Sequence, residues 1–183
     1  GDEVWYVTDN EKDIIGGKDI YMIRKLDERK WSKPVNAGPG INTPFDEESM
    51  RFSKGGDTLW CSSKGHNSTG GFDIFYSIKD QTDKWGKAIN YGYPVNTTWD
   101  EIFFYPFADT DSSFYFASNR PGSLGGLDIF SGRILPPEPV IVPIIPPEPD
   151  TVVIRDTIVV IKEVVKAPVV EPPKETGIYL IGK

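Results

Sequence analysis

Gly70-Gly71-Phe72-Asp73-Ile74-Phe75 is the stretch that decides the fold of this sequence, because its pattern occurs three times. Two glycines, a variable residue, an aspartate, an isoleucine and an aromatic residue are also found at residues 16–21 and 125–130. The aspartates of successive copies are 54 and 55 residues apart. A pattern that recurs at a fixed period is the signature of a repeat protein, in which each copy forms one structural unit.

The residues around this motif keep the same spacing. An aromatic, strand-like segment precedes each Gly-Gly pair, at residues 4–7, 58–61 and 113–116. Three further pairs are separated by 54 residues: Lys30-Trp31 and Lys84-Trp85, Asn42-Thr43 and Asn96-Thr97, and Asp46-Glu47 and Asp100-Glu101. So many positions with one offset indicate a true structural repeat.

Each repeat is expected to form four short strands. In the complete copy these cover residues 49–52, 58–62, 72–78 and 85–89, and glycines in the turns supply positive φ at low cost. Four strands in a repeat of this length are typical of a β-propeller blade. The sequence therefore predicts an all-β fold, a partial β-propeller of about two and a half four-stranded blades. Since a closed ring needs about 4–8 blades, residues 1–135 are expected to be the C-terminal part of a larger propeller.

The composition changes after these repeats. Residues 136–176 are rich in Pro, Val and Ile, which favours extended structure. We interpret them either as a linker or as a tail whose residues 151–165 add a strand to an exposed sheet edge. Residues 177–183 are expected to begin a further β domain.

Charge and hydropathy exclude two classes of partner. The net charge is −7, with 20 basic and 27 acidic residues, and such a chain repels the phosphates of nucleic acid. No apolar run reaches the roughly 18 residues of a transmembrane helix. The sequence opens directly with a strand-like segment, so we expect any signal or lipid anchor to lie outside it.

The sequence offers little for catalysis. Its one histidine, His66, lies in a polar loop where we expect it to be exposed, so a metal site built from several histidines is excluded. Its one cysteine, Cys61, is expected to be a buried apolar filler. No phosphate-binding or dinucleotide-binding motif is present, so we predict no cofactor and no metal, and a non-enzymatic protein.

Two sets of residues remain as candidates. Trp99, Asp100 and Glu101 join an aromatic ring to two acids in an inter-strand loop, and we predict that they contact a partner. The aspartate of the repeated motif could bind calcium, but a lone carboxylate beside glycines more often accepts backbone N–H bonds. We therefore predict a structural role for this last set: Gly17, Asp19, Gly71, Asp73, Gly126 and Asp128.

Residues 57–63 and 114–122 resemble the WD-like propeller repeats of TolB-type proteins. The Gly-Gly-x-Asp-Ile-aromatic motif that follows resembles the form found in Bacteroidota envelope proteins. In that group a propeller is often followed by a carboxypeptidase-regulatory-like β domain, which residues 177–183 resemble, and by an outer-membrane-protein-A-like, peptidoglycan-binding domain. One such protein type belongs to the type IX secretion and gliding apparatus.

The resemblance implies a scaffold on the periplasmic side of the outer membrane, whose partners are other envelope proteins in a peptidoglycan-tethered complex. It also implies O-glycosylation at Asp-Ser/Thr-apolar sequences, which makes Thr151 and Thr157 candidate sites. Two alternatives stay open: a carbohydrate-binding propeller, and the accessory propeller of an enzyme whose catalytic domain lies outside this fragment.

Overall fold

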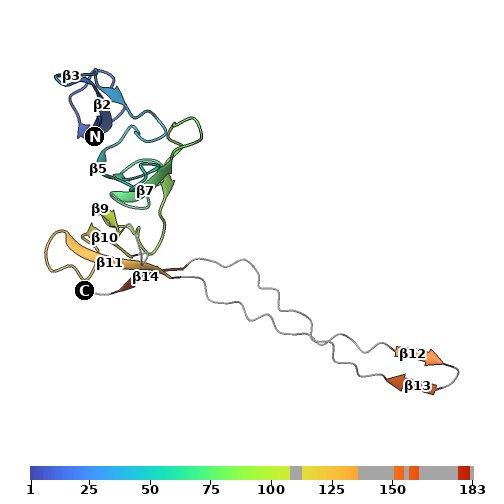
Figure 1. Ribbon diagram of the computed structural model, residues 1–183. Helices are drawn as coiled ribbons and strands as arrows, with labels where there is room; N and C mark the ends of the chain where they lie inside the picture. Colours follow the sequence, from blue (N-terminus) through green and yellow to red (C-terminus); the bar gives the residue numbers. More distant parts are fainter. Residues whose placement is uncertain (108–112, 136–150, 155–156, 161–176, 182–183) are drawn as a thin grey trace. The chain divides into compact units, whose positions relative to one another are not determined.

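The computed structural model describes residues 1–107, 113–135, 151–154, 157–160 and 177–181 (Figure 1). These residues form antiparallel β-sheets and contain no helix, which confirms the all-β prediction. It follows that none of the described residues belongs to a helix that could span a membrane. The chain divides into two compact units, one of residues 1–135 with 178–183 and the other of residues 136–177.

The second sheet shows the complete repeat. It consists of β5 (Glu47–Phe52), β6 (Thr58–Ser63), β7 (Asp73–Ile78) and β8 (Ile89–Asn90), which pair in sequence order. The first sheet has β2 (Asp19–Asp27) paired with β1 (Glu3–Thr8), β3 (Lys30–Trp31) and β4 (Val35–Asn36). In register, β1 and β2 correspond to β6 and β7.

The third sheet contains β9 (Glu101–Pro106), β10 (Ser113–Ser118), β11 (Asp128–Leu135) and β14 (Gly177–Ile181). The order β14-β11-β10-β9 makes β14 the fourth strand of this sheet, whereas the sequence predicts the start of a separate domain at these residues. The structural reason is that the outer edge of β11 presents backbone groups that a further strand can satisfy. Sequence spacing could not reveal this, because a long segment separates the two strands.

β12 (Thr151–Ile154) and β13 (Thr157–Val160) lie within the segment expected to add a strand elsewhere. In the structure they pair antiparallel with each other, Thr151 opposite Val160. Residues 155–156 and 161–165 of that predicted segment lie outside the described residues.

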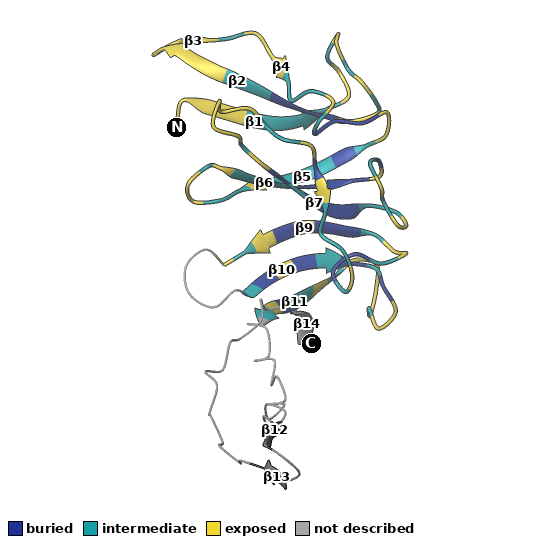
Figure 2. Ribbon diagram, turned by 90° about the vertical axis from the view of Figure 1, so that its right-hand side faces the viewer, coloured by how far each residue is buried: buried dark blue, intermediate teal, exposed yellow. Residues whose placement is uncertain are grey.

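Two apolar clusters join the three sheets into one stack (Figure 2). Successive residues of a strand point to opposite faces of its sheet, so neighbouring residues of β7 enter different clusters. Phe75 packs toward the first sheet with Ile20, and Ile74 packs toward the third sheet with Phe114 and Phe116. The second sheet is therefore covered on one face by the first sheet and on the other by the third.

The glycine pairs explain how closely the sheets approach. A β-carbon at Gly16 would overlap the carbonyl oxygens of Thr43 and Phe45, and one at Gly70 would overlap the backbone of Thr98. The loop that leads into the following sheet thus lies directly on the glycine backbone. Only glycine leaves room for that approach.

We predict that Gly70→Ala lowers the free energy of unfolding by about 1–3 kcal/mol, because the Thr98 backbone cannot move aside without disturbing the stack. The matched control is Gly125→Ala. Gly125 is the same position of the third repeat, and no described atom lies within 4 Å of its β-carbon position. The control should change stability by less than about 0.5 kcal/mol in urea unfolding. Equal losses for the two variants would contradict this explanation of the motif.

Candidate interaction surface and the joints between sheets

An asparagine side chain fastens each inter-sheet loop to the sheet before it. Asn42 Oδ1 accepts the amide of Ile20 at 2.9 Å, and Asn42 Nδ2 donates to the carbonyl of Ile20 at 2.9 Å. Asn96 makes the same two bonds to Ile74, at 2.8 and 2.7 Å. An amide side chain can satisfy a backbone N–H and C=O together, which is why asparagine occupies both positions.

The motif aspartates hold their own loops. Asp19 Oδ2 accepts the amide of Ile15 at 2.7 Å and Nδ2 of Asn36 at 2.8 Å. Asp73 makes the equivalent bonds, to the amide of Thr69 at 2.7 Å and to Asn90 at 3.1 Å. This is the structural role assigned from the sequence. The described residues contain no cluster of three or more His, Cys, Asp or Glu side chains that could hold a metal ion.

A buried glutamate begins the first strand of the second and third sheets. Glu47 accepts the amide of Thr43 at 3.0 Å and the hydroxyls of Thr43 and Ser63 at 2.6 and 2.7 Å. Glu101 accepts the equivalent bonds from Thr97 at 2.8 and 2.7 Å and from Ser118 at 2.8 Å. Both carboxylates are fully buried. They close the turn that carries the chain from one sheet to the next.

We call the contact between the first and second sheets the first joint, and that between the second and third sheets the second joint. The two joints differ in the positively charged residue near the buried glutamate. Arg120, buried in the second joint, donates to Glu101 at 3.0 Å and to the carbonyls of Pro94, at 3.0 Å, and Val95. Its guanidinium lies 4.8 Å from the ring centroid of Phe116. A charge-assisted pair with these additional partners compensates the burial of both ions.

In the first joint a glycine, Gly65, stands at the repeat position of Arg120. The ring of His66, the next residue, lies 5.1 Å from that of Phe75, and its Nε2 is 2.9 Å from the carbonyl oxygen of Ile41. The expectation of an exposed His66 is therefore wrong. The imidazole takes part of the role of the guanidinium, because Ile41 is the repeat counterpart of Val95.

The hydrogen-bond partners of Glu47 among the described residues are neutral. Burial raises its pKa from the ordinary 4.5 to about 7, although the bonds from Thr43 and Ser63 act in the opposite direction. A carboxylate buried without a cation pays its desolvation cost whenever it is charged. Burial also raises the pKa of the Cys61 thiol to about 12, which agrees with the predicted role of an apolar filler.

The three residues predicted to contact a partner differ in how far they are buried. Trp99 has 46% of its surface exposed, and its repeat counterpart Phe45 has 58%. Asp100 is partly buried and accepts the amide of Phe72 at 2.9 Å and Asn119 at 3.0 Å. Glu101 has 0% exposure, so its assignment to the contact surface is wrong. Two consecutive acids in a loop are typical of an exposed surface, but the second acid is buried because Arg120, 19 residues along the chain, pairs with it.

The second glycine of each motif, two residues before the aspartate, differs between repeats in whether a loop side chain lies against it. A β-carbon at Gly17 would overlap Asp46 Oδ1, and one at Gly71 would overlap Asp100 Oδ1. No described atom lies within 4 Å of the same position at Gly126.

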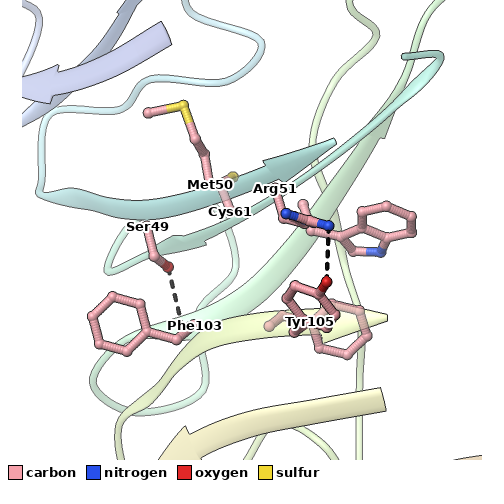
Figure 3. A pocket seen from close by; sticks show the side chains of 8 residues that line it. Ser49, Met50, Arg51, Cys61, Phe103 and Tyr105 are labelled. Carbon is pink, nitrogen blue, oxygen red and sulfur yellow. Dashed lines mark hydrogen bonds between the residues drawn. The ribbon is translucent and has the colours of Figure 1, made fainter. Parts of the chain in front are cut away.

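A hollow of about 190 Å³ between β5 and β9 was not predicted from the sequence (Figure 3). It is lined by repeat counterparts: Ser49 accepts the amide of Phe103 at 3.2 Å, and Arg51 donates to the Tyr105 hydroxyl at 3.1 Å. Ser49 and Phe103 both have positive φ, of 41° and 58°, at bulges in the two strands. Ser49 and Phe103, like Arg51 and Tyr105, are 54 residues apart, so the repeat period is the sequence feature that could have predicted these contacts.

Comparison with protein-family models, with curated proteins and with solved structures finds no match for this chain. The class that fold and joints define is an all-β protein of repeated antiparallel sheets. The resemblance to TolB-type repeats therefore remains a prediction. Thr151 and Thr157 are the first residues of β12 and β13.

We predict unequal losses of stability for the same substitution in the two joints. Glu101→Gln strands the buried Arg120 charge and should cost about 3–5 kcal/mol of unfolding free energy. Glu47→Gln should cost much less, because the amide oxygen can accept the Thr43 N–H while the amide NH2 donates to the Thr43 and Ser63 hydroxyls. Urea unfolding at pH 8 measures both, and a loss for Glu47→Gln as large as that for Glu101→Gln would refute the difference.

The pH dependence gives a second test of Glu47. A folded-state pKa of about 7, above the ordinary 4.5, means that the folded protein binds the proton more tightly. The contribution of Glu47 to stability is therefore complete below pH 4.5 and is lost as the pH rises to about 7. Relative to the unaltered chain, Glu47→Gln should be more stable at pH 8 than at pH 5. A difference independent of pH would show that Glu47 is charged throughout.

Proposed function

We propose that this chain is a non-enzymatic protein–protein interaction scaffold, built as part of a β-propeller and located at the periplasmic face of a bacterial outer membrane. The stacked four-stranded sheets support the propeller, since each sheet packs face to face with the next around a shared joint. The resemblance of the repeats supports the location and a peptidoglycan-tethered complex of envelope proteins.

The observation that carries the interaction function is the repeated exposed aromatic residue of the inter-sheet loop. Phe45 and Trp99 occupy the same position in adjacent repeats, beside a buried Glu whose network fixes the loop. Large aromatic side chains held rigidly and exposed are favoured anchors at protein interfaces. Their recurrence places equivalent anchors at the same end of adjacent sheets.

The test is chemical cross-linking of the chain to an envelope extract, with the double variant Phe45→Ser/Trp99→Ser compared with the unaltered chain. We expect the variant to lose at least about tenfold in cross-linked partner, as hot-spot residues do. The control is Leu26→Ser, an exposed apolar residue of the first sheet outside these loops. Equal capture by all three chains would reject the scaffold proposal at this surface.

A second candidate function rests on Trp99 itself, because an exposed indole beside the carboxylate of Asp100 suits stacking on a sugar ring. A glycan array distinguishes it. Glycan binding that Trp99→Ser abolishes would favour the carbohydrate-binding propeller over the protein scaffold.

We also propose O-glycosylation at Thr151 and Thr157. The intact mass of the protein purified from its native cell should exceed that of the bare polypeptide, and Thr151→Val/Thr157→Val should remove the excess. A native mass equal to that of the polypeptide would eliminate the modification.

A further inference from the structure

The outward face of the third sheet carries the features that receive the next repeat in the two preceding sheets. Ile20 and Ile74, which bind the asparagine of the next loop, have 0% exposure. Their counterpart Ile129 has 73% exposure. The isoleucine that forms each inter-sheet core is thus displayed on the surface of the third sheet.

The backbone beside this isoleucine is also a docking element in both joints. Lys18 donates its amide to Asp46 at 3.2 Å, and its carbonyl accepts the amide of Glu47 at 2.7 Å. Phe72 makes the same pair of bonds to Asp100 and Glu101, at 2.9 and 2.6 Å.

Leu127 holds the corresponding position in the third repeat and is exposed. Beside it, Gly125 and Gly126 leave space for an inter-sheet loop like those that cover Gly16 and Gly70. No described atom lies within 4 Å of either β-carbon position. Glycine at both positions leaves space that no described part of the chain uses.

An aromatic residue extends the same face. Trp60 of the second sheet is partly buried against Phe104, with 5.9 Å between their ring centroids. Its counterpart in the third sheet is Tyr115, which is exposed. An exposed apolar face of this kind, continuous with two formed joints of the same design, indicates an interaction site.

We propose that this face binds a segment with the sequence Asn-Thr-x-aromatic-Asp-Glu followed by a β-strand, that is, a further copy of this repeat from outside these 183 residues. The asparagine binds the backbone of Ile129, and the aspartate and glutamate bind that of Leu127. The aspartate side chain lies over Gly126, as Asp46 lies over Gly17 and Asp100 over Gly71.

The sequence itself argues against the other occupants. Residues 108–112 and 136–183 contain no asparagine, so the rest of this chain cannot supply the joint. A second copy offers Asn42 and Asn96, but both side chains are already engaged with Ile20 and Ile74.

The probe is a fluorescent peptide with the sequence of residues 92–107, titrated with the full chain up to about 1 mM and followed by anisotropy, a range that covers weak docking. We expect saturable binding. A peptide in which Ala replaces the residue equivalent to Asn96 should bind at least tenfold more weakly. Gly126→Val in the chain should also weaken binding at least tenfold, with unchanged urea unfolding, since its side chain fills the place of the aspartate.

Three results would overturn the proposal. One is no binding of the unaltered peptide, and another is equal binding to the Gly126→Val chain. The third is slow hydrogen exchange at Leu127 and Ile129 in the free chain, which would show that its own residues or a second copy cover this face; a monomer–dimer equilibrium in sedimentation separates those two cases. The proposal rests on the proposed propeller but not on the Phe45 and Trp99 anchors, so the cross-linking test and the peptide test can fail separately.

Discussion

The structure depends on one constraint: each sheet is covered only when the loop entering the next sheet lies directly on its glycine pair. Gly16 and Gly70 remove the side chains that would block this approach, and Asn42 and Asn96 then satisfy the backbone beneath the loop. A single four-stranded sheet could not bury both of its apolar faces. Each full repeat therefore combines two binding elements: a glycine-pair surface that contacts the loop of the next repeat, and a loop that contacts the glycine pair of the repeat before it.

Within this common design the two joints solve the burial of a carboxylate differently. Arg120 forms an ion pair with Glu101. His66 contacts the carbonyl of Ile41 and not Glu47, whose hydrogen-bond partners among the described residues are neutral. A buried ion pair fixes geometry but tolerates no loss of one partner, while an unpaired buried carboxyl group takes up a proton instead. Because burial raises the pKa of Glu47 to about 7, we expect the first joint to lose stability as the pH rises through neutrality.

The period and its residue types were sufficient to predict the all-β class, four strands in the complete repeat and the structural role of Asp19 and Asp73. Spacing identifies which positions are equivalent, but not which side chains meet across a joint. Spacing could not show that Glu101 is buried, because its partner Arg120 lies in the loop after β10, whereas Glu101 begins β9. For the same reason the sequence did not predict that β14 joins the third sheet. β14 pairs with β11 although a long segment separates them, and such pairing produces no pattern in the local sequence.

Native-state hydrogen exchange at the amides of Ile74 and Glu101 tests the central claim most directly. Both amides bond across the joint, to Asn96 Oδ1 and to the carbonyl of Phe72. If the sheets depend on one another, these amides should exchange as slowly as those within β6 and β7, and only through unfolding of the stack. Rapid exchange at both, with β6 and β7 still protected, would show that the sheets fold separately and would contradict the account.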